Sequence, residues 1–236
     1  MSPNPSTFVL IPGAWRGAWS WEPVARRLRE AGRDALTLTL PGLADGDSRA
    51  GLHLSDAVHH VVNEMEKRGL DDVTLVGHSW GGYPVTGVAH EAPDRVTKVI
   101  YYNAVVPETG VPLIDENEDD ALMLRAAVET SRDGSVSLVR AQMPLLLPDQ
   151  CEATHRILHA LLVPHPGGYF MDALDVPAVT TLGIPAVYLL SEDDRALCRP
   201  GAEFAARIGV TPRMVPGGHE SLLTHPDEVA RALLDA

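Results

Sequence analysis

The sequence predicts an α/β fold, namely a doubly wound, mostly parallel sheet with helices on both faces and an inserted helical cap. Short apolar runs rich in β-branched residues recur along the chain and are bounded by Pro, Gly or Asp. Such runs are typical of strands that are buried on both faces of a sheet. Segments of helical period separate most of these runs. One long interval breaks the alternation, so we expect a single domain over residues 1–236 with a cap or lid insertion at residues 107–177.

Each expected strand is a run of four to seven mostly apolar residues, or shorter at the C-terminal end. These strands are Phe8–Ile11, Ala35–Leu40, Val73–Val76, Val96–Tyr102, Ala186–Leu190 and a short one closing at Met214 and Val215. The expected helices carry apolar residues at helical spacing and charged residues opposite them. They are Trp21–Ala31, Leu54–Arg68 and Pro226–Leu234. Ser55 is the expected N-cap of the second helix, and Gly32 ends the first.

The interval at 107–177 contains an acidic stretch at 115–120, scattered Pro and Gly, and two further expected helices, Leu122–Val128 and Glu152–Leu162. It falls between two expected strands. We therefore expect it to cover the carboxyl edge of the sheet, where ligands bind in open α/β folds.

Composition excludes several classes of protein. The formal net charge is -13 and no run of Lys or Arg occurs, which argues against nucleic-acid binding. Two cysteines in 236 residues form no disulfide framework and no metal-binding spacing. No apolar stretch approaches the length of a membrane span or a signal-peptide core, so a cytoplasmic protein is expected.

The motif Gly-His-Ser-Trp-Gly at 77–81 follows the expected strand Val73–Val76 and precedes a segment of helical character. A nucleophilic serine needs such a sharp strand-to-helix turn, and glycines must flank it where side chains would collide with neighbouring elements. The motif is weak alone, but its position after a buried strand strengthens it. A phosphate-binding turn would require Gly-x-Gly-x-x-Gly or Lys-Ser/Thr, and neither is present. Ser79 is the expected nucleophile.

A catalytic serine needs a histidine base and a carboxylate that orients it, in the chain order serine, acid, histidine for this kind of turn. Of the ten histidines, His219 alone has this order and stands on a Gly-rich loop before the last expected helix. The strand Ala186–Leu190 runs into two adjacent carboxylates, Asp193 and Asp194, of which one should face the histidine.

Two backbone amides are needed to bind the oxyanion. One is expected from Trp80, directly after the serine, and the other from the loop after the first strand. Pro12 has no N–H. Ala14 is therefore the expected donor, and Gly13 allows a close approach.

With these residues in place, the chain resembles the α/β-hydrolase superfamily along nearly its whole length. Within it, the sequence is similar to the small esterase and hydroxynitrile-lyase branch that includes plant methylesterases. The resemblance rests on three segments and a histidine motif, which are residues 8–21, 77–82, 192–197 and 217–219. In that branch the acid lies three positions beyond a small residue that ends its strand. Counted from Ser191, the resemblance implies Asp194.

The resemblance also implies an apolar acyl or alcohol pocket under the cap. Gly13, Trp15, Tyr169 and Phe170 are the residues expected to bind substrate. Two departures from the branch stand out. Pro12 replaces the usual His, and Gly13 and Glu220 stand where the hydroxynitrile lyases carry Thr and Lys. Without that lysine no group would stabilise a leaving cyanide, which favours ester hydrolysis.

The sequence thus predicts a serine hydrolase that cleaves a small carboxylic ester or lactone through an acyl-enzyme, with no metal and no organic cofactor. Two alternatives stay open. One is a biosynthetic tailoring enzyme using the same triad for elimination, acyl transfer or thioester release. The other is a non-catalytic ligand-binding protein of the same fold, against which the complete set Ser79, Asp194 and His219 argues. The expected partner is a small-molecule substrate, neither nucleic acid nor a membrane, and the chain is compatible with a homodimer.

Overall fold

The computed structural model describes residues 6–148 and 150–236, and its centre is a six-stranded sheet in the order β2-β1-β3-β4-β7-β8. All five strand pairs of this sheet are parallel. The strands are β1 (Thr7–Ile11), β2 (Ala35–Thr37), β3 (Val73–His78), β4 (Val96–Tyr102), β7 (Ala186–Ser191) and β8 (Arg213–Val215). The predicted doubly wound α/β fold is confirmed.

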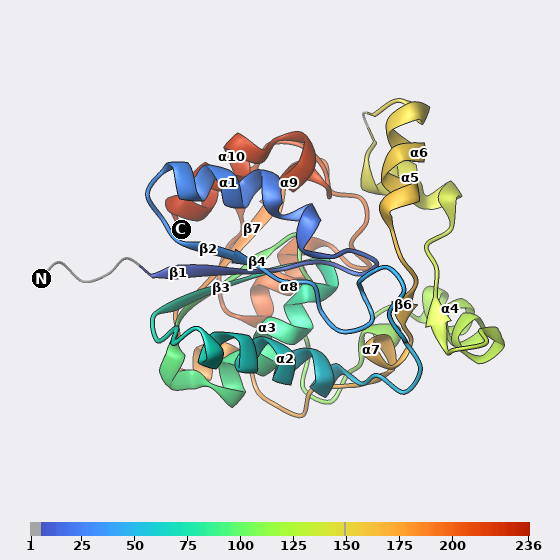
Figure 1. Ribbon diagram of the computed structural model, residues 1–236, viewed down its shortest axis with the longest axis horizontal. Coiled ribbons are helices and arrows are strands. Elements are labelled where there is room, and N and C mark those ends of the chain that lie inside the picture. Colours follow the sequence, from blue (N-terminus) through green and yellow to red (C-terminus); the bar gives the residue numbers. More distant parts are fainter. Residues whose placement is uncertain (1–5, 149) are drawn as a thin grey trace, which may run out of the picture.

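Helices cover both faces of the sheet (Figure 1). On one face lie α1 (Glu22–Glu30), α9 (Ser221–Thr224) and α10 (Pro226–Leu234). On the other lie α2 (Leu54–Lys67), α3 (Gly82–Glu91) and α8 (Gly201–Arg207). The buried apolar residues form two clusters, one on each face of the sheet. One contains Trp21, Leu28 and Val229, and the other contains Val61, Val88 and Phe204. Burial of these faces is the main stabilising contribution to the fold.

The segment between β4 and β7 leaves the sheet and lies to one side of the body (Figure 1). It contains α4 (Glu118–Thr130), β5 (Ser135–Val136), α5 (Met143–Leu146), α6 (Glu152–Leu161), β6 (His165–Pro166) and α7 (Gly168–Met171). β5 and β6 pair antiparallel as a separate two-stranded sheet. A small apolar cluster of its own, including Leu138, Met143 and Leu158, packs against Trp15 and Trp19 of the main body.

Single turns of 3-10 helix connect several of these elements. They are η1 (Ala18–Ser20), η2 (Ser79–Gly81), η3 (Pro93–Arg95), η4 (Leu113–Asp115), η5 (Arg140–Gln142) and η6 (Val179–Leu182). Among the described residues, no helix combines the length and the apolar character that crossing a membrane requires.

Several predicted boundaries were wrong, and two of them have a clear physical reason. The strand expected to reach Leu40 ends at Thr37, because the chain turns away from the sheet before Pro41 and the φ 78 turn at Gly42. The helix predicted over 122–128 is longer, since α4 begins at Glu118 and ends at Thr130. The N-cap of α2 is His53 rather than Ser55. Carboxylates do the capping there, since Asp56 accepts from the His53 N–H at 2.8 Å and Asp172 accepts from the Leu54 N–H at 2.9 Å.

Candidate active site

Ser79 lies at the sharp turn between β3 and the helix that follows. Its φ is 55, a left-handed conformation that a non-glycine residue rarely adopts. The turn is held from both sides, because the Ser79 N–H donates to Asn103 O at 3.1 Å and its carbonyl accepts from the Val105 N–H at 3.0 Å. The flanking glycines are sterically required. A Cβ on Gly77 would lie 2.6 Å from the carbonyl oxygen of Gly81, and one on Gly81 would lie 2.8 Å from that of Pro12.

The loops after β7 and β8 bring a carboxylate and an imidazole together. Asp194 Oδ2 lies 2.7 Å from His219 Nδ1, and both side chains are almost fully buried. Burial raises the pKa of Asp194, but the charge and hydrogen bond of His219 and the amides of Ala196 and Leu197 outweigh it, so that the pKa lies below its ordinary value. The adjacent Asp193 is exposed to solvent. Of the two neighbouring carboxylates, Asp194 is the one aimed at the histidine.

Ser79 and His219 face a common cavity of about 130 Å³. Ala14, Trp15, Trp80 and Phe170 from the predicted site line it, together with apolar residues of the segment between β4 and β7 and of the loop after β7. These are Val105, Leu113, Ile114, Leu124, Leu146, Ala196 and Leu197. A larger groove of about 600 Å³, between α2, α3 and residues 171–176, contains none of the predicted site residues.

The loop after β1 passes directly over the serine. A Cβ on Gly13 would lie 2.9 Å from Ser79 Cβ and 3.0 Å from His78 Nδ1, so only glycine fits without movement. Within the described part of the chain, the N–H of Ala14 donates to no protein acceptor. Because Ala14 lines the cavity, its amide is a candidate donor to an oxygen bound there.

Trp15 is held in a strained conformation by the segment between β4 and β7. Its φ is 66, and three hydrogen bonds fix it there. The Trp15 N–H donates to His165 Nδ1 at 3.2 Å, its carbonyl accepts from the Val163 N–H at 3.1 Å, and its indole N–H donates to Val136 O at 2.8 Å. The loop that carries Ala14 is therefore fastened to the segment above it.

Of the expected substrate-binding residues, Trp15 and Phe170 line the cavity, but Gly13 does not, and neither does Tyr169. Its ring stacks on Trp80 with centroids 4.9 Å apart, and its hydroxyl donates to Pro41 O at 2.9 Å. The indole N–H of Trp80 donates to the Tyr169 carbonyl at 3.0 Å. Tyr169 thus packs behind Trp80, which itself lines the cavity.

Asn103 joins the three loops that carry Ser79, Asp194 and His219. It follows β4 with φ 44, and its carbonyl accepts from the Ser79 N–H. Its side-chain oxygen accepts from the Ser191 N–H at 2.7 Å, at the start of the loop to Asp194. Its side-chain N–H₂ reaches the Ser191 hydroxyl at 2.9 Å and the carbonyl of His219 at 3.3 Å.

Two fully buried histidines stand around this centre. His78 donates from Nε2 to the carbonyl of His219 at 3.0 Å, and its ring lies 4.7 Å from that of His219. Burial holds the pKa of both His78 and His165 well below the ordinary value, with nearby cationic side chains adding to the effect. Both rings are therefore neutral at pH 7.

Sequence reasoning did not find Asn103, His165 or Arg16, which also lines the cavity. Asn103 carried a signal, since it is a polar residue directly after an apolar strand that neighbours the serine strand. Arg16 and His165 carried none, because their partners lie 204 and 150 positions away in the chain.

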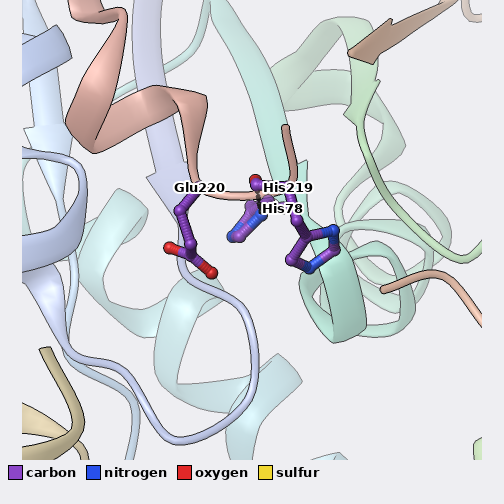
Figure 2. Close-up of side chains that lie close together, drawn as sticks. All are labelled: His78, His219 and Glu220. Carbon is purple, nitrogen blue, oxygen red and sulfur yellow. Dashed lines mark hydrogen bonds between the residues drawn. The ribbon is translucent and has the colours of Figure 1, made fainter. Parts of the chain in front are cut away.

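One group of three side chains has the spacing of metal ligands. Donor atoms of His78, His219 and Glu220 all lie within 4.8 Å of one another (Figure 2). The group does not fit a cation, however. The Glu220 carboxylate is already paired with the buried guanidinium of Arg16, and His219 Nδ1 is engaged by Asp194. A metal ion would have to approach a fixed positive charge.

A family model described as the alpha/beta hydrolase family matches residues 8–232 of this chain. The chain therefore belongs to the alpha/beta hydrolase family, in keeping with its sheet order and its serine turn.

Curated relatives place the chain near the esterases of this family. It is 39% identical over 111 residues to the carbendazim hydrolyzing esterase of Nocardioides sp. (strain SG-4G), an alignment covering 46% of each chain. It is 25% identical over 208 residues to methylesterase 8 of Arabidopsis thaliana, covering 80% of this chain and 73% of the relative. The match to the carbendazim esterase, like that to most of the plant relatives, spans about half of the relative's length.

Solved structures share the fold over the whole chain. An extracellular alpha/beta-hydrolase from a Paenibacillus species superimposes with a TM-score of 0.88 at 23% identity, covering 98% of this chain and 99% of that one. A methylesterase from Arabidopsis superimposes with a TM-score of 0.76 at 20% identity, covering 98% of both chains.

Proposed function

We propose that the protein is a serine hydrolase that cleaves small carboxylic esters or lactones through an acyl-enzyme. The observation that carries this proposal is the hydrogen bond of 2.7 Å between Asp194 and His219, because His219 lines the same cavity as Ser79. The family membership and the esterase names of several relatives support it.

In the proposed reaction, Ser79 Oγ attacks the ester carbonyl while Nε2 of His219 takes its proton, since Nδ1 is engaged by Asp194. The amides of Ala14 and Trp80 bind the oxyanion. The tetrahedral intermediate collapses, His219 returns the proton to the leaving alcohol, and an acyl ester remains on Ser79. A water activated by His219 then attacks this ester, which releases the acid and restores the serine hydroxyl.

The cavity supports a compact, largely apolar substrate. Its volume is about 130 Å³ and most of its lining side chains are aliphatic or aromatic. Residues 107–177 act in this proposal as the cap, which contributes Leu113, Ile114, Leu124, Leu146 and Phe170 to the lining and shields the reacting carbonyl from bulk water.

Turnover of p-nitrophenyl acetate by the wild type, Ser79→Ala and the exposed-site control Ser55→Ala tests the proposal. Ser79→Ala should lose about 10⁴-fold or more in kcat, while Ser55→Ala keeps the wild-type rate. A fluorophosphonate probe should label the peptide that contains Ser79. Equal turnover by the wild type and Ser79→Ala would refute the proposal. Mass spectrometry with added alcohols shows the fate of the acyl group, and free acid as the main product is expected.

A further inference from the structure

An ion pair between Arg16 and Glu220 is buried directly beside the candidate active site. Their side chains are 1% and 0% exposed. The guanidinium approaches the carboxylate with two donors, Nε to Oε2 at 3.2 Å and Nη2 to Oε1. Such a two-pronged contact fixes the relative orientation of both groups as well as their distance.

The pair joins the two loops that carry the groups proposed to act on the substrate. The third arm of the guanidinium donates from Nη1 to the carbonyl of Ala14, at 2.5 Å. Glu220 directly follows His219, and Figure 2 shows the His78 ring between the Glu220 carboxylate and the His219 ring. One guanidinium therefore sets the peptide next to the Ala14 amide and anchors the residue next to the histidine.

Stability alone is a weak explanation for this pair. Removing two charges from water costs several kcal/mol per ion, and well-packed apolar residues often serve a core equally well. The position of the pair, between two loops whose separation decides the geometry of the reaction, offers a different explanation.

We propose that Arg16 and Glu220 are positioning residues, whose ion pair keeps the Ala14 amide and the His219 imidazole at a fixed separation across the carbonyl under attack. This inference rests on the proposed function. Other residues fix His219 itself, since Asp194 holds its Nδ1 while His78 and Asn103 hold its carbonyl. We call these three residues the frame around His219. Arg16 and Glu220 are what tie this frame to the loop after β1.

The charges can be removed together or one at a time. Arg16→Met and Glu220→Met each leave one buried charge without its partner, so each should lower both Tm and kcat. The double variant Arg16→Met/Glu220→Met leaves no unpaired charge and should recover most of the lost Tm. Its kcat should stay about 10- to 100-fold below the wild type with KM within about 3-fold, because a misplacement of about 1 Å is costly in the transition state. A double variant that recovers kcat together with Tm would show a merely structural role and overturn the inference.

A second variant keeps the test valid if the double variant does not fold. Arg16→Lys retains the positive charge but lacks the planar fork that reaches Glu220 and Ala14 together. It should fold and lose about 10-fold or more in kcat. Wild-type kcat in Arg16→Lys would overturn the inference. Glu116→Gln is the matched control, because it disturbs the ion pair of another buried carboxylate, that of Glu116 with the partly exposed Arg207, outside the frame around His219. It should lower Tm and leave kcat unchanged.

A spectroscopic measurement separates failure of this inference from failure of the proposed function. The proton shared between His219 Nδ1 and Asp194 should give a low-field proton resonance in the wild type. It should shift or broaden in Arg16→Lys and in the double variant, and stay unchanged in Glu116→Gln. This resonance needs no substrate. A wild type without esterase turnover would refute the proposed function, whereas an unchanged resonance in every Arg16 variant would refute the positioning role.

Discussion

The backbone N–H of Trp15 donates a hydrogen bond to His165 Nδ1 over 3.2 Å, between residues 150 positions apart in the chain. Because this bond requires a free lone pair on Nδ1, it exists only while His165 is neutral at that nitrogen. Deep burial keeps the pKa of His165 well below its ordinary value, so the bond is maintained at pH 7. Trp15 directly follows Ala14. The conformation of the loop after β1 therefore depends on His165, which belongs to the segment between β4 and β7.

Loss of the hydrogen-bond acceptor at position 165 should lower the activity of the site without abolishing it. His165→Phe keeps an aromatic ring but cannot accept from the Trp15 N–H, and about 1–1.5 kcal/mol of hydrogen bonding is lost. We expect about a 10-fold lower kcat for p-nitrophenyl acetate. His165→Asn, whose side-chain oxygen can take the place of Nδ1, should retain more activity. Equal rates for both variants would contradict this role.

The two buried neutral histidines should make stability depend on pH. In the unfolded chain each takes up a proton near pH 6.5, whereas in the folded chain the lowered pKa of His78 and His165 prevents it. The unfolded state therefore binds more protons, and stability falls as pH drops below about 6.5. The slope is about 1.4 kcal/mol per pH unit for each histidine. Urea unfolding between pH 7 and pH 5 measures it, and His165→Asn should reduce the slope by one proton.

A methyl group on Gly13 should block the site. In Gly13→Ala the new Cβ would lie 2.9 Å from Ser79 Cβ, so the loop must move away from the serine. We expect a kcat about 100-fold lower and a stability loss of about 1–3 kcal/mol. Gly87→Ala is the matched control, since its Cβ would meet Val58 Cγ2 at 2.6 Å, and neither residue lines the cavity. It should lose stability but keep its kcat, and a similar fall in kcat for both variants would contradict the prediction.

Two substitutions of Asn103 should distinguish the contribution of its backbone conformation from that of its side-chain hydrogen bonds. Asn103→Gly permits φ 44 but removes the bonds to Ser191 and to the His219 carbonyl, and we expect kcat to fall by about 10-fold or more. Asn103→Ala removes the same bonds and adds the strain of a left-handed Cβ, about 1 kcal/mol. Its Tm should therefore be lower than that of Asn103→Gly at a similar kcat. Wild-type kcat in the glycine variant would show that the side-chain bonds do not matter.

The two adjacent carboxylates should behave differently. Asp194→Asn removes the charge that orients His219 and should lower kcat by about 10⁴-fold, whereas the exposed Asp193→Asn should change it little. Because the pKa of Asp194 is below its ordinary value in the folded chain, its contribution to stability is full above about pH 4 and is lost as pH falls further. Acid unfolding should shift to higher pH in Asp194→Asn but not in Asp193→Asn. Equal kcat losses would contradict the assignment.

The fold could be predicted, as could the contact of Asp194 with His219 and the cavity that Ser79 and His219 share, because their signals are local. Buried strands such as Val96–Tyr102 are continuous apolar runs, and Ser79 is marked by glycines that the turn itself requires. What could not be predicted depends on distant partners. The capping of α2 by Asp172, the placement of Tyr169 behind Trp80 and the pairing of Arg16 with Glu220 each join segments far apart in the chain. No periodicity or spacing in one sequence records such contacts.

Asn103 has a consequence for how the protein would be inactivated by heat. It is attached to the serine turn, to the end of β7 and to the loop of His219, and its own position is set by the central strand β4. The three loops cannot separate from one another while that strand remains paired. The site should therefore survive until the sheet itself melts, and residual activity after heating should report the fraction of molecules that are still globally folded.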